Sequence, residues 1–300
     1  MRTRRTFAVA LCAIALTATA CGKDGTPGAD TAASGSTAPK LPTYTVKTDA
    51  KVDSAIFTEA KKRGQLIIGA KSDQPFLGFE DLASGDRSGF DIEIAKMIAA
   101  DLGFTPQQIK WQTLVSSQRE PAISKGQIDF YVGTYSINDE RKKTVSFAGP
   151  YFIAGQDFLV KKDNTSITGP ESVNGKNVCT ATGSTSIKNI QQYSPKITQF
   201  DTYSACVEKL MSGEVDAVTT DDAILKGYAS KYAGKLTVVG KPFTKENYGV
   251  GLNKDDAALR GAISDALKAH QDNGDWKKAY DATLGLSGAP APQPPALERY

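Results

Sequence analysis

The chain has 300 residues, with 36 Lys and Arg against 33 Asp and Glu, and 40% of its residues are hydrophobic. This length can form one large or two ordinary domains with real cores, and the near-balanced charge argues against a nucleic-acid partner. A single histidine, His270, leaves little room for Ser-His-Asp or Cys-His catalysis or for a histidine-rich zinc site. The composition therefore disfavours hydrolases and metalloenzymes, and we expect no metal and no other cofactor.

Residues 1–20 are expected to form a signal peptide. A basic start with Arg4 and Arg5 precedes an apolar segment that runs from Phe7 to Ala20 and is too short to cross a bilayer unaided. The residues before Cys21, Ala-Thr-Ala, resemble a bacterial lipobox, so we expect lipidation at Cys21 and anchoring to the outer face of the cytoplasmic membrane. An ordinary signal peptidase site is the alternative, and the paired arginines leave Sec or twin-arginine export open.

Two segments lack apolar periodicity. Residues 21–52 are rich in Gly, Thr, Ala, Ser and Pro and are expected to form a flexible tether behind the lipidated cysteine. Residues 287–300 contain Ala-Pro-Ala-Pro-Gln-Pro-Pro and are expected to be a disordered or polyproline-like tail. The folded body is therefore expected between residues 53 and 286.

Strand and helix signals alternate through this body. Asp53 is the expected cap of a helix that ends at Gly64, a buried strand follows at 66–69, and Asp91 opens a helix that closes at Gly103. Further strands are expected at 109–115, 128–132, 158–160, 177–180, 197–200, 217–220 and 236–239, and helices at 120–125, 184–193, 203–212, 221–231, 255–270 and 275–284. This alternation predicts an α/β fold with mostly parallel sheets flanked by helices.

Cys179 and Cys206 are the two cysteines of the expected exported body. An even pair in an exported protein predicts a disulfide bond, which would stabilise the fold by roughly 3–4 kcal/mol in the chain-entropy model. Two buried free thiols are the alternative.

Five motifs occur in order along the body: Ser-Gly-Phe-Asp-Ile at 88–92, Gln-Arg-Glu-Pro at 118–121, Thr-Tyr-Ser-Ile-Asn-Asp-Glu-Arg at 134–141, Thr-Gly-Ser-Thr-Ser at 182–186 and Asp-Ala-Val-Thr-Thr-Asp at 216–221. Together they make the chain, over residues 53–285, resemble the polar-amino-acid family of bacterial ABC-transporter solute-binding proteins, and most of all the glutamate/aspartate-binding lipoproteins. The resemblance implies a two-lobed, type II periplasmic-binding-protein-like fold with the ligand cleft between the lobes. Lobe 1 is expected at 53–153 and 245–286, and lobe 2 at 154–244.

The charges of a free amino acid are costly to bury unpaired. Arg141 offers a planar fork that suits a carboxylate, although a surface ion pair with Glu140 or Asp139 is the alternative. The resemblance places Arg141 on the ligand α-carboxylate, helped by Thr134, Ser136, Ser184 and Thr185, and Asp221 on the α-ammonium.

Lys71 and Arg119 fall where glutamate/aspartate binders place two cations against the ligand side chain, and Ser116 is a further candidate for that contact. Two such cations would leave buried positive charge uncompensated beside a neutral side chain, so acidic ligands are favoured. The expected cleft walls are Phe76, Tyr135 and Tyr203.

A ligand held by both lobes would favour the closed state, with chain crossings near 152–156 and 241–247. We therefore expect a monomeric, non-enzymatic binding protein that presents glutamate or aspartate to a membrane ABC permease. A sensor for a membrane kinase, a glutamine/asparagine binder and a dehydratase on the same fold are the alternatives; the dehydratase would need a general acid in the cleft.

Overall fold

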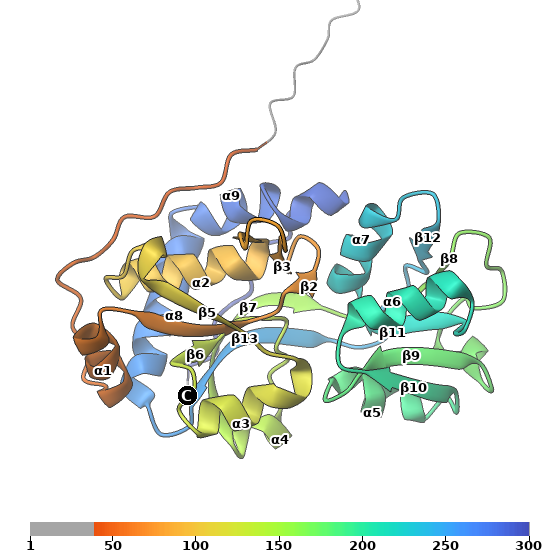
Figure 1. Cartoon of the computed structure of the whole chain (residues 1–300), viewed down its shortest axis with the longest axis horizontal. Coiled ribbons are helices and arrows are strands. Elements are labelled where there is room, and N and C mark those ends of the chain that lie inside the picture. The colour runs from red at the N-terminus through yellow and green to blue at the C-terminus, as the bar shows by residue number, and fades with distance from the viewer. Residues whose placement is uncertain (1–38, 300) are drawn as a thin grey trace, which may run out of the picture. The chain divides into compact units, whose positions relative to one another are not determined.

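The computed structural model describes residues 39–299 (Figure 1). Their α-helices and strands build two lobes on two five-stranded sheets, with strand orders β5-β1-β6-β13-β7 in lobe 1 and β10-β9-β11-β8-β12 in lobe 2. Lobe 1 lies on the left of Figure 1 and lobe 2 on the right. The expected signal peptide, the lipidation site Cys21 and the first part of the expected tether lie outside the described residues. The two-lobed α/β architecture is confirmed.

Lobe 1 contains most of the helices. In chain order its elements are α1 (Ala55–Arg63), β1 (Leu66–Ala70), β2 (Asp73–Gln74), β3 (Gly78–Glu80), β4 (Arg87–Ser88), α2 (Phe90–Asp101), β5 (Ile109–Thr113), α3 (Arg119–Ser124), β6 (Phe130–Tyr131), α4 (Asp139–Lys142) and β7 (Val145–Ala154), and, after lobe 2, β13 (Glu246–Asn253), α8 (Ala257–Asp272) and α9 (Asp275–Asp281). Strands β2, β3 and β4 form a separate small sheet.

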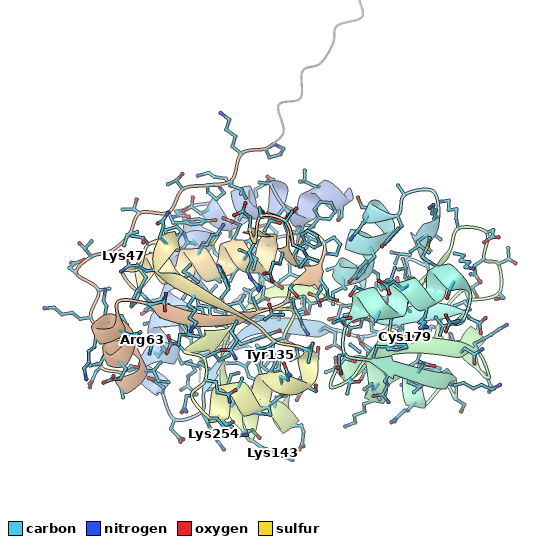
Figure 2. All side chains as sticks on the ribbon, viewed as in Figure 1. Lys47, Arg63, Tyr135, Lys143, Cys179 and Lys254 are labelled. Atoms are coloured by element: carbon cyan, nitrogen blue, oxygen red, sulfur yellow. A yellow bond between two sulfur atoms is a disulfide. The ribbon has the colours of Figure 1, made fainter. Side chains whose placement is uncertain are left out.

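Lobe 2 contains β8 (Gln156–Lys161), β9 (Asn177–Ala181), α5 (Thr185–Gln191), β10 (Lys196–Phe200), α6 (Tyr203–Ser212), β11 (Ala217–Asp221), α7 (Asp222–Lys231) and β12 (Leu236–Val238). The predicted disulfide is confirmed: Cys179 of β9 is bonded to Cys206 of α6 (Figure 2). It fastens a helix to the sheet that it covers.

Both sheets are mixed, and the expectation of mostly parallel sheets was wrong. In lobe 1, β1 runs parallel to β5 and β6, whereas β13 is antiparallel to β6 and β7. In lobe 2, β9 runs parallel to β10 and β11, whereas β8 is antiparallel to β11 and β12. The antiparallel strands adjoin the chain crossings, and their direction is set by the crossing rather than by their own apolar pattern.

Strands β7 and β13 form the connection between the lobes. They pair antiparallel from Asn253↔Val145 to Glu246↔Ala154: β7 runs toward lobe 2, and β13 runs back from it into lobe 1 (Figure 1). The chain enters lobe 2 directly after β7, through Gly155, and returns between β12 and β13. The crossings were expected near these positions, but the long strands on either side of them were not.

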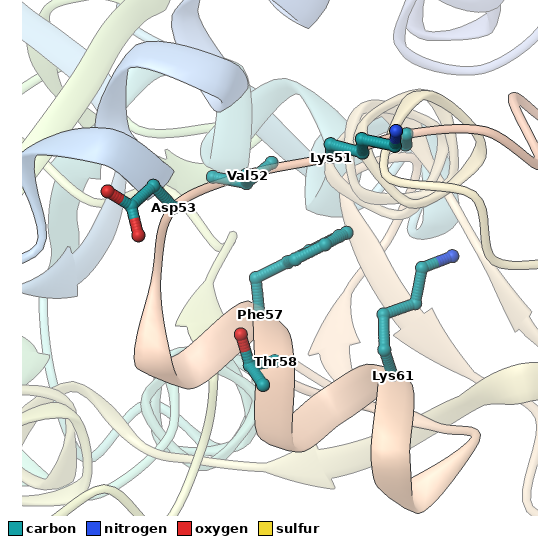
Figure 3. A pocket seen from close by; sticks show the side chains of 7 residues that line it. Lys51, Val52, Asp53, Phe57, Thr58 and Lys61 are labelled. Atoms are coloured by element: carbon teal, nitrogen blue, oxygen red, sulfur yellow. The ribbon is translucent and has the colours of Figure 1, made fainter.

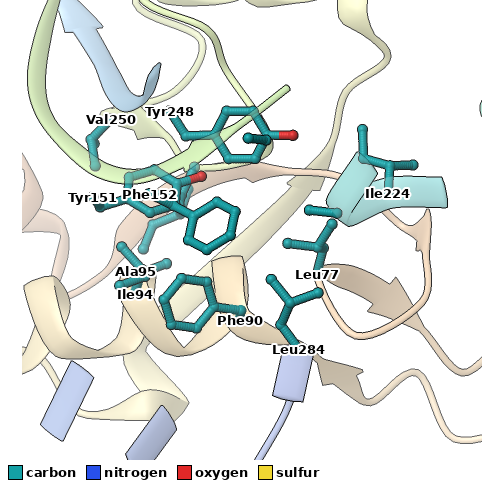
Figure 4. Packing of buried hydrophobic residues seen from close by; sticks show 14 of the residues in the cluster. Leu77, Phe90, Ile94, Ala95, Tyr151, Phe152, Ile224, Tyr248, Val250 and Leu284 are labelled. Atoms are coloured by element: carbon teal, nitrogen blue, oxygen red, sulfur yellow. The ribbon is translucent and has the colours of Figure 1, made fainter. Parts of the chain in front are cut away.

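An aromatic cluster fills the centre of lobe 1 (Figure 4). The Phe90 ring, at the start of α2, lies 5.3–6.3 Å from the rings of Tyr151, Phe152, Trp276 and Tyr280. The Trp276 Nε1–H donates to the Tyr151 carbonyl at 2.8 Å. A buried Phe stabilises by about 1.5–3 kcal/mol, so this cluster fixes β7 against α2 and α9.

Helix α1 begins one residue later than the sequence suggested. Ser54, not Asp53, caps it by accepting a hydrogen bond from Phe57 N–H, and Gly64 ends it with φ 68°. Ser and Asp are both good caps, so the pattern alone could not separate adjacent candidates.

The ends of the described chain, residues 39–52 and 287–299, contact lobe 1, and the flexible tether and disordered tail stay predictions. Near the first end, the Tyr44 hydroxyl donates to Glu93 at 2.9 Å. Near the other end, Glu298 N–H donates to the Gly149 carbonyl at 2.7 Å, and Leu297 packs against the core. Apolar residues without periodicity in these segments therefore make contacts with lobe 1.

Candidate functional site

A small polar cavity lies between the two lobes. Lobe 1 contributes residues from the segment 116–141, and lobe 2 contributes the start of α5 and the junction of β11 with α7. Its lining residues are Ser116, Arg119, Thr134, Ser136, Arg141, Ser184, Thr185, Ser186, Tyr203, Asp221 and Ile224. The cavity therefore has donors and charges on both sides.

Arg141 is buried in the short helix α4, which Asn138 caps by accepting from the Arg141 backbone N–H. Its Nη1 donates to the Ser136 carbonyl at 2.7 Å, and its Nε lies 3.2 Å from a Glu120 carboxylate oxygen. Burial, together with the charge of Arg119, lowers the pKa of Arg141 to about 10. Arg141 thus faces the cavity, and the surface pair with Glu140 or Asp139 is not formed.

Arg119 is only 2% exposed at the start of α3. Its guanidinium donates to the backbone carbonyls of Ser116 at 3.0 Å, Gly183 at 3.2 Å and Thr134 at 3.4 Å. Among residues 39–299, no carboxylate forms a salt bridge with it. Arg119 is therefore a buried cation whose charge the described part of the protein leaves uncompensated.

The Tyr135 ring lies close to both guanidinium groups and is not among the residues that line the cavity. Its ring centroid is 4.3 Å from the Arg119 guanidinium carbon and 4.8 Å from that of Arg141. The electron-rich ring stabilises two like charges that would otherwise repel each other. Its predicted role as a wall was wrong, because Tyr135 contacts the two cations and does not line the cavity.

Lys71 follows β1 and is 4% exposed. Its Nζ donates to Ser116 Oγ at 2.8 Å, and this hydroxyl separates it from the cavity. Burial, and secondarily the charge of Arg119, lowers the pKa of Lys71 to about 7. Lys71 is thus part of the site but not of its lining.

Asp221 ends β11 on the lobe 2 side of the cavity. Its Oδ2 accepts from the Tyr248 hydroxyl at 2.7 Å, whereas its buried Oδ1 has no hydrogen-bond partner among the described residues. Burial, and then the charge of Glu246, raises the pKa of Asp221 to about 7. The neighbouring Asp222 turns away and accepts from Gly155 N–H. An unpaired carboxylate oxygen beside a cavity is suited to receive a cation.

Five more of the predicted residues belong to the lining of the cavity. Thr134, Ser136, Ser184, Thr185 and Tyr203 line the cavity. The Thr185 hydroxyl is already engaged, because it donates to Glu246 at 3.1 Å.

Phe76 does not line this cavity, so its prediction as a cleft wall was wrong. It lines a separate apolar groove with Pro75, Phe79 and Leu286. Its backbone has φ 64°, which turns the chain after β2 and directs the ring to the groove.

Contacts between the lobes surround the site and were not predicted. Asp73 of lobe 1 accepts from Ser204 N–H at 3.1 Å, and its carbonyl accepts from the Tyr228 hydroxyl at 2.6 Å. A Cβ on Gly227 of α7 would lie 2.4 Å from the Pro75 carbonyl oxygen, and one on Gly183 would lie 2.7 Å from Ser117 Cα. The closed arrangement therefore requires glycine at two positions. Only their spatial neighbours, which the sequence does not give, could have identified them.

Ser186 and Ile224 also line the cavity without having been predicted. Ser186 belongs to the Thr-Gly-Ser-Thr-Ser motif, which offered a signal for it, whereas Ile224 looked like an ordinary helix residue.

A second hollow lies beside α1 (Figure 3). It is lined by residues of the segment 50–53 and by Phe57, Thr58 and Lys61. It brings together no buried charges and lies on lobe 1 alone, so we do not assign it the ligand.

A metal centre and a membrane span are both missing from the described chain. Among residues 39–299, no three His, Cys, Asp or Glu side chains are grouped to hold a metal ion. Over the same range, no helix has the length and apolar character needed to span a bilayer.

The geometry is complementary to a small zwitterion with additional negative charge. The fork of Arg141 matches a carboxylate, Asp221 Oδ1 matches an ammonium group, and Arg119 leaves one further positive charge to be neutralised. The cavity lining thus holds two guanidinium groups, of which Arg141 also pairs with Glu120, and one carboxylate.

Comparison with known proteins agrees with this description. The glutamate-binding protein GluB of Corynebacterium glutamicum is 39% identical over 241 residues, which cover 76% of this chain and 81% of GluB. The glutamine-binding protein GlnH of Bacillus subtilis is 36% identical over 222 residues, which cover 73% and 81%.

Solved structures give the same fold. An ancestral arginine-binding protein bound to glutamine has a TM-score of 0.70 and 36% identity, and the match covers 74% of this chain and 99% of that one. Holo ArgBP from T. maritima has a TM-score of 0.66 and 31% identity, with 71% and 92% covered. Residues 66–285 match the family model, which confirms the resemblance drawn from the motifs. The chain belongs to the bacterial extracellular solute-binding proteins, family 3.

Proposed function

We propose that this protein binds an acidic amino acid, glutamate or aspartate, in the cavity between its lobes and presents it to an ABC importer. The observation that carries the proposal is Arg119, a buried guanidinium without a carboxylate partner among the described residues. A buried cation of this kind costs several kcal/mol unless an anion compensates it. An acidic side chain supplies that anion.

Each part of the ligand has a matching group. The α-carboxylate binds Arg141, with Thr134, Ser136, Ser184 and Thr185 around it, and the α-ammonium binds the free oxygen of Asp221. The side-chain carboxylate binds Arg119 and the Ser116 hydroxyl, with Lys71 behind Ser116 and Tyr203 along the wall. Arg141 and Asp221 belong to different lobes, so the bound zwitterion stabilises the closed state over the open one.

A neutral polar ligand is the second candidate, and two of the similar proteins support it. GlnH is named as a glutamine-binding protein, and the ancestral structure is bound to glutamine. Against this, glutamine would leave the Arg119 charge uncompensated in a site that already holds Arg141 and Lys71. GluB, named as a glutamate-binding protein, supports the acidic ligand.

Calorimetry of the purified, ligand-depleted protein tests the proposal. We expect glutamate and aspartate to bind at least tenfold more tightly than glutamine and asparagine at pH 7, and arginine to show no binding. Tighter binding of the amides would assign the neutral ligand. No binding to any of the five would refute the assignment of the cavity.

Family membership also confirms that the protein is a solute-binding protein and not an enzyme. We further propose that it acts as a monomer, that it is anchored through a lipid on Cys21 to the outer face of the cytoplasmic membrane, and that its closed form docks on a permease. Membrane fractionation of Cys21→Ser tests the anchor: we expect release into the soluble fraction, and unchanged membrane association would exclude it.

A further inference from the structure

We propose that Lys71 and Ser116 act together as a proton-dependent selector that changes the preference of the site between a carboxylate and an amide side chain. The inference rests on the proposed function, because it assumes that the ligand side chain reaches Ser116. It adds a mechanism by which external pH sets the ligand.

The two residues form a pair in which only one faces the ligand. Lys71 is buried, and its Nζ lies 2.8 Å from Ser116 Oγ. Ser116 lines the cavity, whereas Lys71 does not. The charge state of Lys71 therefore reaches the ligand most directly through the Ser116 hydroxyl.

A hydroxyl has one hydrogen to donate and lone pairs to accept. An ammonium has only donors, so a charged Lys71 makes Ser116 Oγ its acceptor and leaves the Ser116 hydrogen free for an acceptor in the cavity. A neutral amine has a lone pair, so an uncharged Lys71 can accept the Ser116 hydrogen and leave an oxygen lone pair toward the cavity. The first state suits a carboxylate, and the second suits the NH₂ of an amide.

The charged groups around Lys71 act on its pKa in opposite directions. Among the described residues, no carboxylate is within salt-bridge distance of its Nζ, and its backbone carbonyl accepts from the Arg87 guanidinium at 2.9 Å. Two cations and two more distant carboxylates act on it: Arg119, Arg141, Asp73 and Asp91. Burial and Arg119 bring the pKa of Lys71 to about 7, so the empty site holds both protonation states near neutral pH.

The ratio of glutamate affinity to glutamine affinity depends on the proton of Lys71 and not on the proton of Asp221. Both ligands require the Asp221 carboxylate for their ammonium group, so the titration of Asp221 cancels in the ratio of glutamate affinity to glutamine affinity. Glutamate binding retains or takes up a proton at Lys71, whereas glutamine binding favours its release. Proton linkage then predicts that the ratio falls by about tenfold per pH unit over the range in which the glutamate complex keeps the Lys71 proton and the glutamine complex has lost it.

The experiment is calorimetry of the purified protein with glutamate and with glutamine at pH 6.5, 7.5 and 8.5, each in two buffers of different ionisation enthalpy. At pH 8.5 we expect glutamate to take up nearly one proton more than glutamine does. Lys71→Arg, with a fixed charge, and Lys71→Met, with none, are both expected to remove the pH dependence of the ratio. Lys110→Met, on an exposed lysine of β5, is the matched control and is expected to keep it.

The outcomes separate the inference from the proposed function. A wild-type ratio that stays within twofold from pH 6.5 to 8.5 overturns the selector, although both ligands bind. A pH-dependent ratio that persists in Lys71→Met assigns the proton to another group and also overturns it. Failure of glutamate to bind at every pH instead overturns the proposed function.

Discussion

The substitution Arg119→Ala is expected to weaken the binding of glutamate and aspartate much more than the binding of glutamine. The guanidinium is buried, and its donors now go only to backbone carbonyls of Ser116, Gly183 and Thr134 within the described chain. With an acidic ligand it becomes one half of a buried ion pair. With an amide ligand it contributes only a hydrogen bond.

The magnitudes differ accordingly. Breaking a buried ion pair by removing one partner costs about 3–5 kcal/mol, whereas a hydrogen bond to a charged group contributes about 1.5–3 kcal/mol. The bond from Arg119 to the Gly183 carbonyl crosses the lobes, so its loss weakens closure equally for both ligands. The difference of about 1.5–2 kcal/mol lowers the preference for glutamate roughly tenfold or more.

Calorimetry at pH 7 with both ligands measures this preference. Arg63→Ala is the control, because Arg63 ends α1 on the outside of lobe 1 and pairs with Asp129; it is expected to change neither affinity. Equal losses for glutamate and glutamine, within about threefold, would show that Arg119 does not contact the ligand side chain. The reasoning from uncompensated charge would then be refuted.

Three further results are expected. Arg141→Ala leaves the ligand α-carboxylate unpaired and is expected to weaken every amino acid ligand by about 3–5 kcal/mol in calorimetry; affinity retained within threefold would contradict its role. Burial raises the pKa of Asp221 to about 7, so a proton competes with the ligand ammonium for this carboxylate. Glutamate affinity is therefore expected to fall by up to about tenfold per pH unit below 7. A glutamate affinity that does not change below pH 7 would contradict the role of Asp221 in binding the ammonium group. Gly227→Ala is expected to block closure of the lobes, because the added Cβ would meet the Pro75 carbonyl oxygen, and to lower ligand affinity at least tenfold. The melting temperature of the ligand-free protein is expected to stay the same or rise, because Ala favours a helix more than Gly does. Gly261→Ala in α8, where an added Cβ meets nothing within 4 Å, is the control, and an unchanged affinity in Gly227→Ala would disprove the closed contact.

The sequence alone identified the α/β class, the disulfide and most of the residues that line the cavity. These conclusions rest on local information: apolar periodicity, the pairing of two cysteines and motifs in which functional residues follow strand ends. Arg141 and Asp221 were assigned through the resemblance that the five motifs carry, and a fork-shaped cation and a carboxylate suit the charges of a free amino acid. Information of this kind can be read from the amino-acid sequence without knowledge of the fold.

The tertiary structure decided what depends on neighbours distant in sequence. Tyr135 supports two cations instead of lining the cleft, and Phe76 turns into another groove. Strand direction in the sheets followed from the crossings between the lobes. The need for glycine at Gly183 and Gly227 arises only when a second lobe approaches to van der Waals distance.

The charge state of the site also belongs to the tertiary structure. Lys71 and Asp221 are an ordinary lysine and aspartate in the sequence, yet burial brings both pKa values to about 7. Desolvation depends on every group packed around a side chain, and the fold alone assembles that surrounding. The sequence therefore determined which groups could bind a ligand, and the closed pair of lobes determined their protonation.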